Sequence, residues 1–273
     1  MTTDHRITRR QALAAAGATL AFGPALRAPA ADQKRQFRIG ACDWSIGKRQ
    51  NVAALEVARE IGLDGVQVSF GEPGGAFDLR QDDVRKQYAE GCKEHGVEIC
   101  SLAMGILNGR PYASDPETEQ WVADSVEVAP KMGVRVILLA FFGKGDIKGK
   151  PDAQREVIRR LKKVAPAAEK AGVILGIESW LDADEHLALL DAVGSPAVKV
   201  YYDVANMHYS GYDIYREIRQ LGRERICEVH AKERGVLLGK GPIDFQKVKA
   251  ALDDLLKAPT PANLAGKKRK KRA

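Results

Sequence analysis

Short apolar runs and longer amphipathic stretches alternate along the chain from Phe37 onward. A short apolar run bounded by turn residues is typical of a buried strand, and apolar residues at every third or fourth position predict a helix. The apolar runs predict seven strands, over residues 37–44, 65–70, 97–103, 134–142, 173–179, 198–204 and 226–233. The amphipathic stretches predict a helix after each strand, over residues 51–62, 82–95, 116–132, 152–171, 183–193, 212–221 and 245–256.

A glycine separates several predicted helices from the next strand, at Gly62, Gly96, Gly133 and Gly172. Glycine adopts the left-handed backbone conformation that commonly ends a helix. Seven strand–helix units without a break favour a (β/α)8 TIM barrel, an α/β fold. A doubly wound sheet is the alternative, but no G-x-G-x-x-G turn follows the first strand.

An eighth unit is not recognisable after Leu256, where the sequence continues as KAPTPANLAGKKRKKRA. Two prolines and the lack of a β-branched run beyond Thr260 make this segment a poor strand. We therefore expect an incomplete barrel over residues 32–257, followed by a disordered basic tail over residues 258–273.

The first 31 residues have the composition of a secretory signal peptide. A charged start precedes an apolar stretch, Ala12 to Phe22, that is too short to span a bilayer. Arg9 and Arg10 form a twin-arginine-like motif, although Ala12 stands where that motif usually has phenylalanine. We favour this export route over an ordinary signal peptide, and expect a periplasmic mature chain without a transmembrane segment.

The formal net charge of +7 belongs to the two ends of the chain. Residues 1–30 carry +3 and residues 267–272 carry +6, which leaves a body of −2. A slightly acidic body offers no broad basic surface to a phosphate backbone, so no nucleic-acid partner is expected despite the tail. The four cysteines form no C-x-x-C pair, which indicates small buried side chains rather than a disulfide framework.

Three potential metal ligands stand at the ends of consecutive predicted strands: Glu178, Asp203 and His230. Each alone has a structural explanation, as a helix cap, a turn residue or a buried core histidine. In TIM barrels, however, the carboxyl ends of the strands form one face, where the active site lies. Two carboxylates and an imidazole that converge there predict a site for one divalent cation.

The segments GIESW, YYDVANMHYSGYD and EVHAKE resemble the sugar phosphate isomerase/epimerase family of xylose-isomerase-like TIM barrels. The resemblance covers about Arg38 to Leu256. The group includes ketose 3-epimerases, hydroxypyruvate isomerases and inosose dehydratases, with endonuclease IV as a relative. It implies a metal-dependent isomerase or epimerase that transfers a proton through an enediolate of a small sugar or sugar phosphate. The metal would be one Mn, Mg, Co or Zn ion.

The resemblance also implies roles for single residues. Glu178 matches the glutamate that binds the metal and exchanges a proton with substrate carbon, while Asp203 and His230 match the other two metal ligands. His208 and Lys232 match substrate-contacting residues. For Lys232 the alternative is an ion pair with Glu233 at the rim.

Three further residues are candidates for substrate contact. Trp44 and Trp180 follow the first and fifth strands and are placed to form aromatic walls for a sugar ring, with packing at the rim as the alternative. Lys144 follows the fourth strand and is a candidate ligand for a substrate oxygen, although a solvated loop is the simpler interpretation.

The family's fourth ligand, a glutamate that ends strand eight, has no counterpart, because no residue after Asp254 is acidic. That glutamate is also the second acid/base of the family. One-base 1,2-isomerisation or no turnover is therefore expected rather than 3-epimerisation. The alternative is a truncated, non-catalytic sugar-binding barrel. An endonuclease IV-like nuclease is disfavoured because no histidine ends strands two to four.

Overall fold

The computed structural model describes residues 37–257. The chain divides between Arg38 and Ile39, and the part from Ile39 onward holds every element named below. Its strands are β1 (Gly40–Cys42), β2 (Gly65–Ser69), β3 (Glu98–Met104), β4 (Val136–Phe141), β5 (Ile174–Ser179), β6 (Val198–Asp203) and β7 (Ile226–His230). Its α-helices are α2 (Ala54–Ile61), α3 (Asp82–His95), α4 (Glu117–Lys131), α5 (Pro151–Ala171), α6 (Ala183–Val193), α7 (Val204–Tyr209), α8 (Ile214–Arg225) and α9 (Phe245–Lys257). Two 3-10 turns, η2 (Gly105–Asn108) and η3 (Gly143–Gly145), follow β3 and β4.

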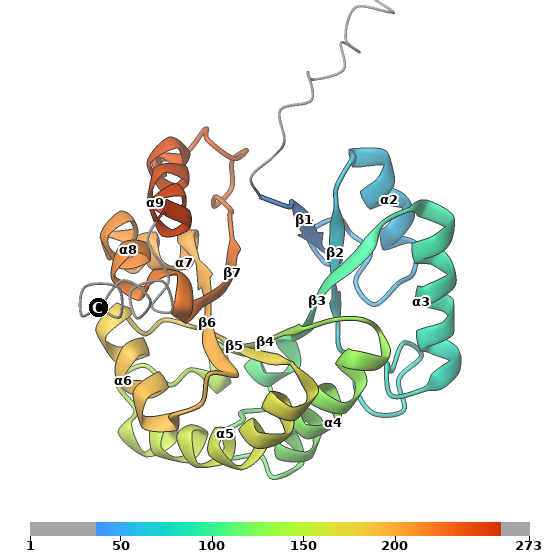
Figure 1. Ribbon diagram of the computed structural model, residues 1–273, viewed down its shortest axis with the longest axis horizontal. Helices are drawn as coiled ribbons and strands as arrows, with labels where there is room; N and C mark the ends of the chain where they lie inside the picture. The colour runs from blue at the N-terminus through green and yellow to red at the C-terminus, as the bar shows by residue number, and fades with distance from the viewer. Residues whose placement is uncertain (1–36, 258–273) are drawn as a thin grey trace, which may run out of the picture. The chain divides into compact units, whose positions relative to one another are not determined.

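The strands form one parallel sheet in the order β1 to β7, so each strand pairs with its neighbours in the sequence. Figure 1 shows these strands around the centre of this part, with the helices on the outside. This arrangement confirms the predicted TIM-barrel fold with seven units. Over residues 37–257 no strand pairing joins β7 to β1. The predicted tail and the predicted signal peptide lie outside the described residues.

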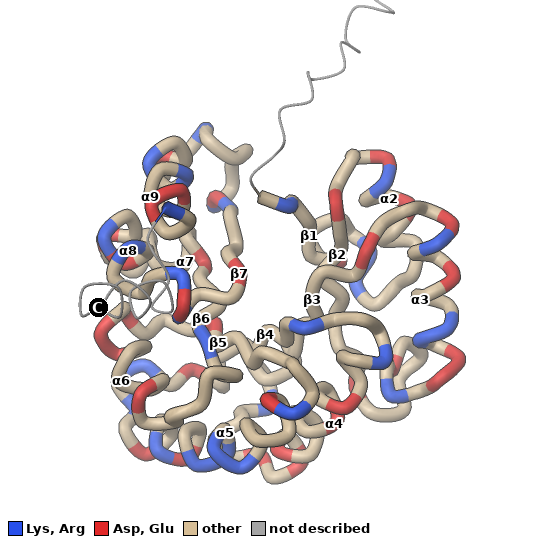
Figure 2. Tube along the Cα trace, viewed as in Figure 1, with Lys and Arg blue, Asp and Glu red and all other residues tan. Residues whose placement is uncertain are grey.

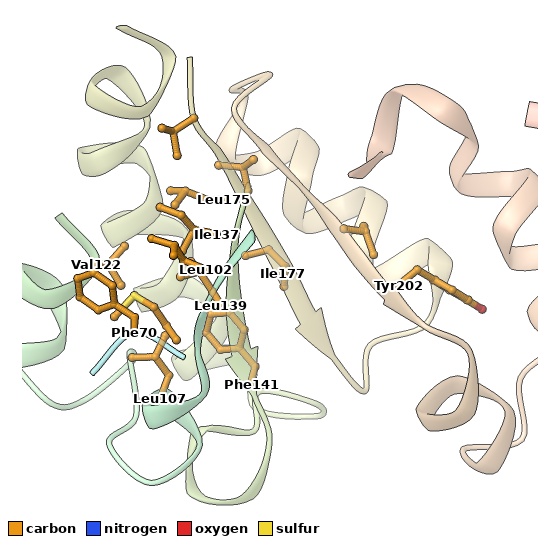
Figure 3. Close-up of a cluster of buried hydrophobic side chains, with 14 of the residues drawn as sticks. Phe70, Leu102, Leu107, Val122, Ile137, Leu139, Phe141, Leu175, Ile177 and Tyr202 are labelled. Carbon is orange, nitrogen blue, oxygen red and sulfur yellow. The ribbon is translucent and has the colours of Figure 1, made fainter. Parts of the chain in front are cut away.

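The core has two layers because alternate residues of a strand face opposite sides of the sheet. Outward-facing side chains pack against the helices, and Leu102, Ile137, Leu139, Leu175 and Ile177 form the centre of this layer (Figure 3). Each large apolar side chain buried in this way stabilises the fold by about 1.5–3 kcal/mol. A smaller inner cluster consists of Ala103, Leu138, Ala140 and Tyr201.

Most charged residues lie on the outer helices, whereas the strands carry only a few, such as Glu178, Asp203 and Glu228. Figure 2 shows acidic and basic residues interspersed along α3, α4, α5 and α6. No helix within residues 37–257 combines the length and the apolar character that crossing a membrane requires.

The predicted glycine stops are confirmed. Gly62, Gly96 and Gly172 are the C-terminal caps of α2, α3 and α5, with positive φ angles of 82°, 65° and 65°. Gly133 has a φ of 69° and follows Met132, the cap of α4. A left-handed residue lets the chain leave each helix and turn back toward the sheet.

Two elements differ from the sequence-based expectation. The first strand is shorter, because only Gly40–Cys42 of the predicted segment pairs with β2. Helix α7 was not predicted, since six residues are too few to show a helical period. It begins because the Asp203 carboxylate accepts a hydrogen bond from the Asn206 amide at 2.9 Å, as an N-terminal cap does.

His186 anchors the loop between β5 and α6 as a buried, neutral imidazole. Its Nδ1 donates to the Asp182 carbonyl and its Nε2 accepts from Ser179 Oγ, each at 3.0 Å. The ring is 1% exposed, and this burial lowers its pKa from 6.5 to about 4. Protonation of this ring therefore favours the unfolded chain.

We predict a loss of stability in mild acid that depends on His186. Above pH 6.5 the imidazole is neutral in both states. As the pH falls from 6.5 to about 4, the unfolded chain binds a proton that the folded protein does not, so stability falls by about 3 kcal/mol. Urea unfolding at pH 7.5, 5.5 and 4 measures this slope. His186→Gln should flatten it, and an unchanged slope would contradict the prediction.

Candidate active site and metal centre

Three side chains meet at the carboxyl ends of β5, β6 and β7: Glu178, Asp203 and His230. His230 Nδ1 lies 3.0 Å from Glu178 Oε1 and 3.8 Å from Asp203 Oδ2. One ligand atom from each residue falls within 4.8 Å of the other two. Both carboxylates are buried, with 6% and 2% exposure, and the sequence-based grouping of the three is found in the fold.

The register of β6 against β7 brings Asp203 level with His230. Val200 pairs with Ile226 and Tyr201 pairs with Glu228, so Cys227 is an additional residue on β7, a β-bulge. After the bulge, Glu228 and His230 face the inside of the sheet together with Tyr201 and Asp203. The bulge therefore turns the His230 ring toward the carboxylates.

Burial and mutual charge set the protonation of the three groups. Burial raises the pKa of Glu178, although the hydrogen bond from His230 acts in the opposite direction. Burial would also lower the pKa of His230, but its polar contacts with Asp203, Cys42 and Glu178 and the charge of Glu178 outweigh this effect, and the pKa lies well above 6.5. Asp203 has a pKa of about 2, since its contacts with His230 and Lys232 outweigh the opposing effect of burial.

The donor set fits a divalent metal ion. Two buried carboxylates and one imidazole are ligands that Mn, Co and Zn accept, and one neutral and two anionic donors balance the charge of such a cation. Two buried carboxylates this close to each other are stable only beside a positive charge. Without a metal ion, the His230 imidazolium and the Lys232 ammonium supply that charge.

Lys232 Nζ lies 2.5 Å from Asp203 Oδ2, so this lysine pairs with a candidate metal ligand rather than with Glu233. Glu233 instead accepts a hydrogen bond from the Ile243 amide at 3.2 Å. The Lys232 side chain is 47% exposed, so it reaches from the rim into the site.

The two tryptophans lie on different parts of the rim. The ring of Trp44 meets His230 edge to face at 6.4 Å between centroids, next to the three ligands. Trp180 meets Phe142 edge to face at 5.1 Å. Trp44 and Phe142 also pack against the inner cluster of the sheet, so an aromatic surface adjoins the site.

Two sequence-based candidates have no contact with the three ligands among the described residues. His208 lies on α7, and its ring packs against Tyr209 at 5.2 Å. Lys144 lies on η3 and lines a hollow of about 320 Å³ beside Lys150 and Asp146. Their roles as substrate contacts stay predictions.

Sequence reading missed a set of polar residues on the inner face beside His230: Cys42, Gln67, Ser101, Tyr201 and Glu228. Cys42 Sγ lies 3.4 Å from His230 Nε2, and Gln67 Oε1 lies 3.1 Å from the same nitrogen. The sequence feature that could have revealed this polar network is Gln67, a polar side chain in the middle of the buried run GVQVS. A buried polar group requires hydrogen-bond partners, which is a reason to look for them.

Comparison with known proteins decides the family. The family model described as xylose isomerase-like TIM barrel matches residues 55–256. The chain belongs to this family. The matched range includes β2 to β7, and with them Glu178, Asp203 and His230.

Relatives of this xylose isomerase-like barrel include two epimerases. The chain is 27% identical over 207 residues to 2-epi-5-epi-valiolone 7-phosphate 2-epimerase of Actinoplanes sp., covering 76% of each protein. It is 24% identical over 213 residues to L-ribulose-5-phosphate 3-epimerase of Escherichia coli, covering 71% of this chain and 74% of the relative.

Solved structures show the same barrel fold. A D-tagatose 3-epimerase-like protein superposes with a TM-score of 0.67 at 16% identity, covering 80% of this chain and 87% of that chain. D-psicose 3-epimerase, solved in the presence of D-fructose, gives a TM-score of 0.65 at 18% identity, with 80% and 81% covered. Because both sequence identities are low, these two superpositions show a shared fold and nothing about activity.

Proposed function

We propose that this protein is a metal-dependent isomerase or epimerase of a small sugar or sugar phosphate. The observation that carries the proposal is the convergence of Glu178, Asp203 and His230 at the carboxyl face of the sheet. Family membership and two epimerase relatives with phosphorylated substrates in their names support the substrate class.

Glu178 is the proposed base. Burial raises its pKa, which brings the carboxylate closer to the basicity that proton abstraction from carbon requires. A divalent ion bound by the three residues would stabilise the negative charge of an enediolate derived from the substrate. Glu178 then returns the proton to the neighbouring carbon or to the same carbon. Trp44, whose ring meets His230 edge to face, would shield this side of the site from water.

Lys232 is the proposed contact for a substrate oxygen. In the present arrangement its ammonium neutralises Asp203 at 2.5 Å. With a divalent ion held by Glu178, Asp203 and His230, Lys232 would be free to turn toward a substrate at the rim, where 47% of its side chain is exposed. A cation at this place stabilises an oxygen that gains negative charge during the reaction.

Hydrogen–deuterium exchange at substrate carbon tests the function. The purified protein, supplied with Mn²⁺, Co²⁺ or Zn²⁺, is incubated in D₂O with D-fructose, L-ribulose and ketose 5-phosphates, and proton NMR follows the carbons next to the carbonyl. We expect deuterium to enter one of these substrates only with the metal ion, and EDTA to stop the exchange reversibly. The product formed distinguishes 1,2-isomerisation from inversion at C3.

Two outcomes count against the enzyme. A protein that binds none of the three metal ions contradicts the proposed site. A protein that binds metal and sugar without exchange is the non-catalytic sugar-binding barrel, the second candidate.

A further inference from the structure

Gln67 lies at the centre of a hydrogen-bond network inside the sheet. Its side chain is 2% exposed, and β2 places it level with Cys42 on one side and Ser101 on the other. Its Nε2 lies 2.9 Å from Ser101 Oγ and 3.0 Å from Tyr201 Oη. Its Oε1 lies 3.1 Å from His230 Nε2. All polar atoms of this buried amide therefore have partners.

Ser101 and Tyr201 fix which way the Gln67 amide points. Gln67 Nε2 donates to Ser101 Oγ and to Tyr201 Oη. The Glu228 carboxylate lies near both hydroxyls and attracts their protons, which leaves the hydroxyl oxygens to accept from the NH2 end of Gln67. The Oε1 end must then face His230. The Cys42 thiol, 3.3 Å away, also donates to Oε1.

An acceptor at that place fixes the histidine tautomer. Gln67 Oε1 cannot donate, so His230 Nε2 must carry a proton and donate it. When His230 binds as a neutral ligand, its lone pair is then on Nδ1, the nitrogen that lies 3.0 Å from Glu178 and 3.8 Å from Asp203. Partners of this kind orient a ligating histidine and commonly change metal affinity by 10- to 100-fold.

We propose that Gln67 is the positioning residue of the metal centre, oriented by Tyr201, Ser101 and Glu228 so that His230 presents Nδ1 to the metal ion. Gln67 itself lies behind the ring and contacts neither the metal position nor the substrate. The inference rests on the proposed metal site.

Gln67→Met tests the proposal, because methionine has a similar length and offers no strong acceptor. In the metal-free protein labelled with ¹⁵N-histidine, we expect the wild-type His230 Nε2 proton to exchange slowly and to give a ¹H–¹⁵N signal. Gln67→Met should lose this signal. Calorimetric titration with Zn²⁺ should show an affinity about 10- to 100-fold weaker than that of the wild type.

Two neighbouring tyrosines on β6 provide a matched pair of variants. Tyr201→Phe removes a hydroxyl that holds the Gln67 amide, and we expect zinc affinity to fall several-fold. Tyr202→Phe removes an equally buried hydroxyl that donates to Glu217 at 2.8 Å, and zinc affinity should stay at the wild-type value. Equal losses in both variants would mean that a general loss of packing lowers the affinity, and would overturn the proposal.

The results separate this inference from the proposed function. If the wild type binds no zinc, the proposed metal site fails, while the Nε2 proton still reports on the Gln67 contact. If zinc binds but the loaded protein carries the imidazole proton on Nδ1, Gln67 does not set the tautomer. A folded Gln67→Met protein with wild-type zinc affinity overturns the inference as well.

Discussion

Glu178→Gln is expected to lower the rate of carbon-bound proton exchange by about 10²–10⁴-fold or more. Glutamine has nearly the same shape as glutamate, but its amide cannot accept a proton from carbon at neutral pH. The substitution also replaces one anionic metal ligand by a neutral one, so zinc affinity should fall. Exchange of deuterium into the substrate and metal content after dialysis are the two measurements. Retention of full exchange would show that Glu178 is not the base.

Glu217→Gln is the matched control for this variant. Glu217 is also a buried glutamate, with 7% exposure against 6% for Glu178, and burial raises its pKa as well. Its carboxylate accepts hydrogen bonds from Tyr202 Oη and the Ala183 amide, away from the three ligands. We expect Glu217→Gln to cost stability and to keep the exchange rate per folded molecule. A similar loss of activity in both variants would point to a general effect of neutralising a buried carboxylate.

Asp203→Asn is expected to weaken binding of the divalent ion by at least about 100-fold, because one anionic donor is lost from a set of three. The helix cap should survive, since an asparagine side-chain oxygen accepts from the Asn206 amide as the aspartate does. Lys232 loses its anionic partner and becomes more mobile. Calorimetric titration with Zn²⁺ at constant pH gives the affinity, and circular dichroism confirms that the fold is kept.

A second capping aspartate provides the control for that experiment. Asp213 accepts from the Arg216 amide at 3.1 Å at the start of α8, and it belongs to no metal-ligand group within residues 37–257. Asp213→Asn makes the same chemical change at the same kind of helix position. We expect zinc binding to be unchanged by Asp213→Asn. If Asp203→Asn binds zinc as well as Asp213→Asn does, Asp203 is not a ligand.

The order of elements and the grouping of the three candidate ligands were predictable from sequence because both depend on local patterns. A buried strand such as Val136–Phe141 is a continuous apolar run, and each glycine stop marks where a helix ends. Glu178, Asp203 and His230 were recognisable because each ends such a run. Parallel strands place their ends on one face, so the three residues were expected near one another, although in a β7 of this length the inward orientation of the His230 ring depends on the bulge.

The surroundings of the ligands were not predictable in the same way. Gln67 and Tyr201 lie 134 residues apart, and only strand register brings them together. Lys232 had a neighbouring carboxylate in Glu233, but the fold pairs it with Asp203 on the adjacent strand. Contacts of this kind depend on which side chain of each strand faces the inside of the sheet. Where a bulge interrupts the alternation, the sequence pattern does not specify which side chains face inward.

The bulge at Cys227 determines which changes in the length of β7 the candidate site can tolerate during evolution. Substitution of Cys227 by another small residue leaves the number of residues in β7 intact, and His230 still faces Asp203. Deletion of Cys227 itself would remove the bulge but keep Tyr201 level with Glu228 and Asp203 level with His230, so the ring would still face inward. A deletion between Glu228 and His230 would instead take His230 out of level with Asp203 and turn its ring to the helical side of the sheet. Length changes in that part of β7 should therefore be selected against more strongly than loss of the bulge.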